Sequence, residues 1–370
     1  MRVTFANQFR GIAAILVLIS HYYGSIFFQQ DYITSITGAH KVNLDVNSFF
    51  LPKVIAQHYF NIFLGPLGVA MFFMVSGFVV MFSLDKISSS QFLVQRFFRI
   101  FPTYWLSLLI CFVLTLISSY YFGGASGYIS LDFKVIAANI LLVYEYFLYP
   151  SINFVNWTLP VEILFYIIMA LGVRSVRDRE TFLFSSAAIL AGVAIYLNFT
   201  GVNSIASDVL RVTVMKLKYV SFMLSGVAVY LHFKGIIKSS KLSVLLAFFM
   251  LIFASLLYAE YKPPVFFGYL NNYLYGFIVF MIFYFFRDHS KDNILLDFMA
   301  KISYPLYLIH STCGYVMIPI LLSLGLGFYT SSIMSIVVSI IISYLMHVTV
   351  EVYSVNLGKS LSNKLSENPA

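Results

Sequence analysis

Long apolar runs separated by short polar segments make up almost the whole chain. Eleven such runs occur, near residues 8–28, 62–84, 98–120, 134–149, 157–173, 181–199, 212–233, 242–259, 265–286, 301–323 and 328–350. Nearly all reach the length of about 17 residues that lets a helix cross a hydrocarbon core about 30 Å thick. The runs are continuous and do not alternate with a period of two. They therefore predict membrane-spanning helices rather than barrel strands.

Composition supports this interpretation. The chain is 60% hydrophobic and 10% charged, whereas about 25% charged residues are usual in soluble domains. We predict an all-α fold, a polytopic transmembrane helical bundle. The net charge of +8 is scattered between apolar runs, so no nucleic acid partner is expected. Cys111 and Cys313 fall inside apolar runs and predict no disulfide framework.

The positions of Lys and Arg test how many runs cross, because cytoplasmic loops carry the excess positive charge. If the run at 134–149 does not cross, the basic stretches 174–179 and 234–241 both become cytoplasmic. With ten spans and a cytoplasmic N-terminus, seven of the 23 basic residues lie outside: Lys41, Lys53, Lys134, Arg211, Lys216, Lys218 and Lys262. We predict about ten spanning helices plus one short re-entrant helix at 134–149, with an ordinary eleventh span as the alternative.

Residues 1–358 are expected to form one membrane domain, followed by a short cytoplasmic tail at 359–370 that is polar and disordered. Both termini are then cytoplasmic. The longest outside connection, 29–61, contains His40 and His58 and is either a cover over an outer vestibule or an ordinary loop.

Arg10 and His21 are the most informative polar residues. An ionisable side chain at the centre of a lipid-facing helix costs about 2.5 kcal/mol or more, so such residues usually face a protein interior or a cavity. Eleven residues of helix correspond to about 20° beyond whole turns and roughly 16 Å of rise, which places both on one face. This arrangement suits a polyanionic ligand whose long arm reaches inward.

Arg96 and Arg99 are spaced i,i+3 at the cytoplasmic start of the third run. Two guanidinium groups match phosphate geometry, although anchoring by positive charge also places arginines at membrane boundaries.

Glu162 lies just inside the fifth run. A buried carboxyl group must pair, hydrogen-bond or take up a proton. It could orient His21, bind a sugar hydroxyl or serve a structural role.

Ser303, Tyr307 and His310 form an i, i+4, i+7 stripe in the tenth span. They are expected to line a cavity, or alternatively to join helices by hydrogen bonds, with His310 also a candidate second base. Pro305 is expected in the first helical turn.

Two further pairs have mainly structural interpretations. Ser76 precedes Gly77 in the second span, where the glycine permits close helix approach. His347 and Glu351 are spaced i,i+4 and are expected to form an ion pair.

Together these residues resemble acyltransferase family 3, a family of bacterial integral-membrane acyltransferases. The resemblance covers nearly the whole chain and rests on five motifs in order: Arg10-x10-His21, SGF at 76–78, RxxR at Arg96 and Arg99, WTLPVE ending at Glu162, and SYPLYLIH from Ser303 to His310. The chain departs from the family after Glu351, where relatives often carry a proline shortly afterwards. That departure argues against a functional role for Glu351.

The resemblance implies an O-acyltransferase of the bacterial inner membrane. It would use acyl-coenzyme A, with acetyl favoured, as co-substrate, with no permanently bound cofactor and no metal. The expected acceptor is a cell-envelope polysaccharide or its lipid-linked oligosaccharide precursor, and membrane lipid is the surrounding partner. A small hydrophobic alcohol such as a macrolide is the alternative acceptor.

The resemblance implies that Arg10, His21, Arg96 and Arg99 are functional, and the chemistry of the side chains suggests the following roles. Arg10, Arg96 and Arg99 would hold coenzyme A phosphates, and His21 and Glu162 would be catalytic. Ser76, Ser303, Tyr307 and His310 would line the substrate cavity, with Ser303 or Tyr307 donating to the thioester oxygen. Direct transfer and an acyl-histidine intermediate both remain open. A transporter or flippase for a polyanionic lipid or glycan is the rival class, although the two related halves common in transporters are not evident.

Overall fold

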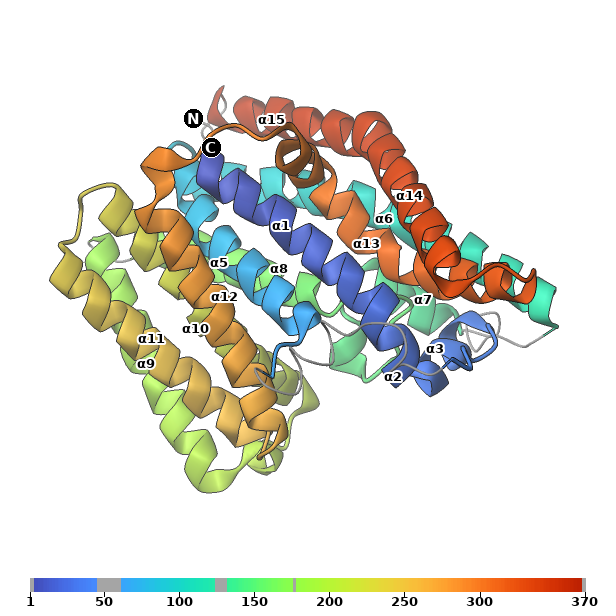
Figure 1. Ribbon diagram of the computed structural model, residues 1–370. Coiled ribbons are helices and arrows are strands. Elements are labelled where there is room, and N and C mark those ends of the chain that lie inside the picture. Colours follow the sequence, from blue (N-terminus) through green and yellow to red (C-terminus); the bar gives the residue numbers. More distant parts are fainter. Residues whose placement is uncertain (1–2, 45–60, 124–131, 176–177, 368–370) are drawn as a thin grey trace. The chain divides into compact units, whose positions relative to one another are not determined.

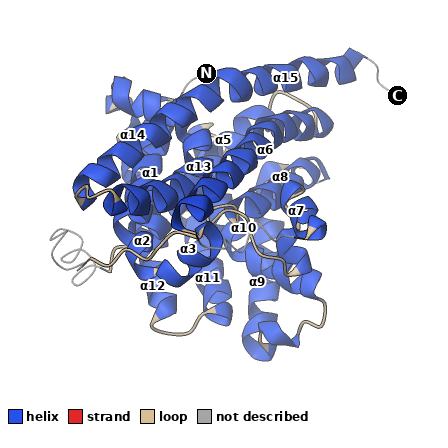
Figure 2. Cartoon of the chain, turned by 90° about the vertical axis from the view of Figure 1, so that its right-hand side faces the viewer, coloured by secondary structure: helices blue, strands red, loops and turns tan. Residues whose placement is uncertain are grey.

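The computed structural model describes residues 3–44, 61–123, 132–175 and 178–367. Every regular element in that part of the chain is a helix, so the predicted all-α class is confirmed (Figure 2). The chain divides into two compact units. The first comprises Met1–Gly68, Phe98–Trp157 and Lys291–Leu357, and the second Val69–Phe97, Thr158–Ser290 and Gly358–Ala370.

Nine helical segments of the described chain are long and apolar enough to cross a membrane. The first is Thr4–Phe28, made of α1 (Thr4–Ser20), the π-helical turn η1 (His21–Ser25) and α2 (Ile26–Phe28). The last is Phe328–Lys364, made of α14 (Phe328–Met346), the π-helical turn η6 (His347–Glu351) and most of α15 (Val352–Glu367). The others are α5 (Leu64–Leu84), α6 (Ser89–Phe122), α9 (Arg179–Thr200), α10 (Asp208–Phe233), α11 (Ser239–Glu260), α12 (Val265–Phe285) and α13 (Ile294–Ser323). The shorter apolar helix α8 (Thr158–Ser175) stands at the place of the remaining predicted span.

The segment 134–149 does not form a continuous span. Helix α7 (Phe133–Ile140) has eight residues, which gives it a rise of about 12 Å. Leu142 then takes a positive φ of 57°, and a short 3-10 helix, η3, covers Tyr144–Phe147. The eleventh-span alternative is therefore excluded. A short helix is present here as predicted, and its re-entrant course stays a prediction.

In the first unit, α13 lies between α1 and α14 (Figure 1). A methyl group added at Gly11 of α1 would collide with the carbonyl oxygen of Leu296 in α13, so the two backbones approach closely. Helix α13 begins earlier than its apolar run because the side chain of Asn293 accepts a hydrogen bond from the Leu296 amide at 3.0 Å. The predicted placement of Pro305 in the first turn is therefore wrong. It lies in the helix interior, which transmembrane helices tolerate when neighbouring groups satisfy the freed backbone.

The second unit contains a similar close crossing. A methyl group at Gly77 of α5 would collide with the Met223 carbonyl of α10, and one at Gly226 would collide with the Met74 carbonyl. This confirms the packing interpretation of Gly77.

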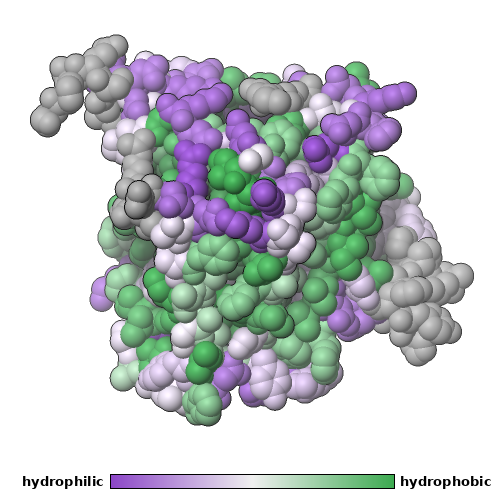
Figure 3. Space-filling view, turned by 90° about the vertical axis from the view of Figure 1, so that its left-hand side faces the viewer, coloured by the Kyte–Doolittle hydropathy of each residue, from purple (hydrophilic) through white to green (hydrophobic). Residues whose placement is uncertain are grey.

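On the side of α9 and α11, apolar side chains cover much of the surface (Figure 3), and Ile189 and Leu251 are both 68% exposed. Such a surface matches lipid tails.

Two segments that were expected to be irregular, the C-terminal tail and the connection 29–61, contain helix. The disorder expected after Lys359 is wrong as far as Glu367, because α15 continues to that residue. Gln91 and Gln95 of α6 donate hydrogen bonds to the carbonyl and hydroxyl of Ser362, at 3.0 and 2.8 Å. In the connection 29–61, residues Gln30–Thr37 form helix α3, while His58 lies outside the described residues.

Candidate functional site in the first span

The first transmembrane helix changes its geometry at His21. Residues 4–20 are α-helical, so Arg10 and His21 keep the predicted helical relation up to this point. His21 then begins the five-residue π-helical turn η1. Single π-helical turns widen a helix locally and are frequent at functional sites. The turn therefore sets the direction of the side chains just where the buried histidine stands.

His21 is buried among aromatic side chains of its own unit. Its Nδ1 lies 2.6 Å from the hydroxyl of Tyr315. The ring of His310 packs edge-on at 4.8 Å, and the ring of Phe154 does so at 5.1 Å. None of these three neighbours carries a carboxylate. Two of them, the Tyr315 hydroxyl and the His310 imidazole, can give or accept a proton, and His21 is not held by them in an ion pair.

The loop before α8 closes one side of this cluster and supplies Phe154. Asn153 is fully buried, and its side chain donates to the carbonyl of Leu308 and accepts from Ser311 at 2.9 Å. Tyr307 donates to the carbonyl of Val155 at 3.0 Å. Asn139 of α7 ties the other end by donating to the Pro150 carbonyl at 2.9 Å. The short element at 133–147 therefore supports the loop that packs against His21.

The three residues of the predicted stripe on α13, Ser303, Tyr307 and His310, have different surroundings. His310 faces His21, whereas the hydroxyl of Tyr307 is directed to the loop. Ser303 is fully buried and donates to the carbonyl of Ala300, one turn earlier, at 2.8 Å. For either hydroxyl to donate to a thioester oxygen, it would have to give up this backbone partner. Their oxyanion role stays a prediction.

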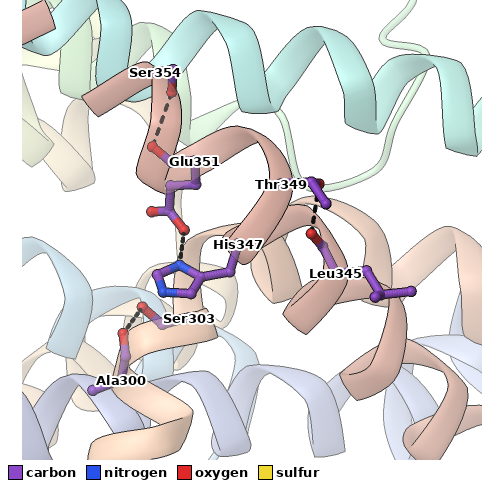
Figure 4. Close-up of polar contacts among 7 residues, drawn as sticks. All are labelled: Ala300, Ser303, Leu345, His347, Thr349, Glu351 and Ser354. Carbon is purple, nitrogen blue, oxygen red and sulfur yellow. Dashed lines mark hydrogen bonds and ion pairs between the residues drawn. The ribbon is translucent and has the colours of Figure 1, made fainter. Parts of the chain in front are cut away.

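Ser303 lies near the second π-helical turn, η6 (Figure 4). His347 begins this turn and Glu351 ends it, and Nδ1 of the imidazole is 2.7 Å from the carboxylate. The other ring nitrogen of His347 faces Ser303 in the view of Figure 4. The predicted i,i+4 contact is thus present and joins two residues of the last span.

Glu162 belongs to a polar cluster of the second unit. Its Oε1 accepts hydrogen bonds from Tyr166 at 2.5 Å and from Ser76 at 3.1 Å. The guanidinium of Arg96 lies 5.1 Å from the centre of the Tyr166 ring and donates to Ser83 at 2.9 Å. Three motifs far apart in the sequence therefore meet here, through Ser76, Glu162 and Arg96. The orientation of His21 by Glu162 stays a prediction, because the two residues belong to different units.

The remaining predicted residues are Arg10 on α1 and Arg99 on α6, both half-buried. Arg99 follows Arg96 by three residues of one continuous helix, so the two project from one side of it. No group of three or more His, Cys, Asp or Glu side chains suited to a metal ion occurs within the described ranges. The coenzyme-binding role of the arginines stays a prediction.

Sequence reasoning missed Tyr315, Phe154 and Tyr166. Tyr166 could have been found, since it follows Glu162 by one helical turn. Tyr315 stands five residues after His310, which is not a same-face spacing in a helix. Phe154 lies in a loop, where no periodicity points to a partner.

Comparison with known proteins places these motifs in context. A family model described as an acyltransferase domain, that of acyltransferase family 3, matches residues 3–348. No curated protein and no solved structure matches the sequence.

Proposed function

Because the chain belongs to acyltransferase family 3, a family of membrane-bound acyltransferases, we propose that it transfers an acetyl group from acetyl-coenzyme A to a hydroxyl of a cell-envelope polysaccharide or of its lipid-linked precursor. The observation that carries this proposal is the burial of His21 beside Tyr315 and His310 in the first span. An imidazole with these neighbours suits proton transfer to and from a hydroxyl. The proposed location is the bacterial inner membrane, with both termini cytoplasmic.

In the proposed reaction, His21 takes the proton of the acceptor hydroxyl. The oxygen attacks the thioester carbonyl carbon, a C–O bond forms, and the C–S bond breaks. The proton then passes from His21 to the sulfur of coenzyme A. Tyr315 is in place to hold the imidazole through Nδ1 during these steps.

The phosphates of the donor would be held by Arg10, Arg96 and Arg99 through charge-assisted hydrogen bonds. Support comes from the half-buried position of all three side chains on α1 and α6. The aromatic rings under Arg96, those of Phe92 and Tyr166, hold its guanidinium in a fixed orientation. Glu162 accepts two hydrogen bonds on one oxygen, which suits a carboxylate that binds a sugar hydroxyl through the other.

Labelled acetyl-coenzyme A tests the proposal in proteoliposomes that contain the full chain and extracted lipid-linked glycans. Wild type is expected to label the glycan, and His21→Ala to reduce labelling by about a hundredfold or more, as expected for loss of a general base. His289→Ala removes an exposed histidine and serves as the matched control. Full labelling by His21→Ala would exclude His21 as the base. Movement of glycan across the membrane without consumption of acetyl-coenzyme A would instead identify a transporter.

A further inference from the structure

The two ring nitrogens of His310 have different surroundings. Nδ1 lies 2.8 Å from the carbonyl oxygen of Leu306 and 2.9 Å from that of Tyr307. Carbonyl oxygens only accept hydrogen bonds, so Nδ1 carries the hydrogen. A neutral imidazole has one N–H group. Nε2 of His310 is therefore left with a lone pair.

This lone pair is buried and accepts no hydrogen bond from the described residues. His310 is 1% exposed, and its Nε2 has no hydrogen-bond partner among the described residues. A buried acceptor left unpaired costs about 1–3 kcal/mol. Native proteins satisfy nearly all such groups, and a catalytic role is one recognised explanation for an exception. The imidazole packed against this ring is that of His21, with ring centres 4.8 Å apart and planes at 81°.

We propose that the lone pair of His310 Nε2 is kept for the proton that His21 removes from the acceptor hydroxyl, so that the two imidazoles share it until it is transferred to the sulfur. This inference rests on the proposed function. A positive charge formed in an apolar interior is costly unless it is hydrogen-bonded. The groups that face His21 from α13 and the loop are Tyr315, His310 and Phe154. Of these, His310 offers the basic lone pair.

His310 thus acts through His21 and is a positioning residue. A purely structural role would need only the Nδ1 hydrogen bonds to the helix carbonyls. The two roles therefore depend on different nitrogens of one ring. Substitutions that keep one nitrogen's function and remove the other's can separate them.

Two variants make this separation. In His310→Asn, the short amide keeps a donor near the position of Nδ1 but places no acceptor at Nε2. In His310→Gln, the longer amide brings an acceptor oxygen to about the position of Nε2. We expect the asparagine variant to lower kcat at least tenfold with KM for acetyl-coenzyme A unchanged, and the glutamine variant to recover part of the loss. Asparagine activity equal to wild type, or above that of the glutamine variant, would overturn the proposal.

A second readout does not depend on acyl transfer. Imidazole nitrogen NMR of the full-length, histidine-labelled protein in nanodiscs, with His310→Asn used to assign the signals, should show a protonated Nδ1 and an unprotonated Nε2 for His310. On acidification, the signals of His21 and His310 should change together. A protonated Nε2, or separate changes of the two rings, would overturn the shared proton. If wild type transfers no acetyl group, the proposed function fails while these signals still decide the relation between the two histidines.

Discussion

His21 and His347 both begin a π-helical turn in the first unit, one in the first span and one in the last. The turn at His21 directs a buried imidazole toward the Tyr315 hydroxyl, the His310 ring and Phe154. The turn at His347 ends on Glu351, whose carboxylate lies 2.7 Å from the imidazole. The same backbone feature thus gives one histidine neutral partners and the other a carboxylate.

From this difference we infer that the partner of each histidine, and not the π-helical turn itself, decides what the turn contributes. Each histidine has one ring nitrogen in a close contact, with the Glu351 carboxylate for His347 and with the Tyr315 hydroxyl for His21. A histidine beside a hydroxyl and a second imidazole faces groups that both give and take protons. We therefore expect changes at the first turn to affect acyl transfer and changes at the second to affect stability.

Deletion of one residue from each turn should give the largest contrast. A π-helical turn contains one residue more per hydrogen-bonded ring than an α-helical turn, so deleting Gly24 or Thr349 favours regular α-helix. Deletion of Gly24 should rotate His21 away from Tyr315 and lower acetyl transfer by about a hundredfold. Deletion of Thr349 should separate His347 from Glu351 and leave transfer within about threefold. Size-exclusion profiles would verify that both proteins fold. Full transfer after deletion of Gly24 would show that the first turn is not needed.

A smaller effect is expected from the hydroxyl beside His21. Tyr315→Phe removes one buried hydrogen bond, worth about 0.5–1.5 kcal/mol, and should therefore slow transfer about threefold to tenfold. Tyr304→Phe is the matched control on the same helix, because it removes a hydroxyl that donates to the Ile100 carbonyl at 2.8 Å. Initial rates at saturating acetyl-coenzyme A measure both. Equal losses in the two variants would point to a general weakening of α13 instead of a role at His21.

The spans were predictable from the sequence because burial in lipid requires long apolar runs, and their observed bounds mostly lie within a few residues of the runs. The early starts of α6 and α13 were not predicted, because charged or polar residues such as Arg96 and Asp297 interrupt the apolar pattern there. In α13 the N-cap Asn293 sets the boundary. The short helix in 134–149 was predicted from the distribution of charge, but the positive φ of Leu142, just after α7, has no sequence signal.

The candidate site was predictable only where partners share one helix. His347 with Glu351, and Glu162 with Tyr166, follow from i,i+4 spacing. The meeting of His21 with Tyr315 and His310 depends on how α1 packs on α13, and no sequence signal marks the π-helical turns. Lys218 was assigned to the outer side of the membrane by the distribution of charge, and no sequence signal indicated that it is 3% exposed and paired with Glu260. Its burial depends on tertiary contacts.

The smallest effect on transfer is expected at the second turn. Glu351→Gln keeps the shape of the side chain but removes the charge that faces His347, in a pair whose side chains are 21% and 10% exposed. We expect a loss of about 1 kcal/mol in stability, seen as a melting temperature lower by a few degrees, with acetyl transfer unchanged within about twofold. Ser354→Ala, which removes the hydroxyl that donates to the Glu351 carbonyl at 3.1 Å, is the control for local packing. If Glu351→Gln slowed transfer as much as Tyr315→Phe does, the carboxylate pair would belong to the reaction, and the contrast between the two turns would be wrong.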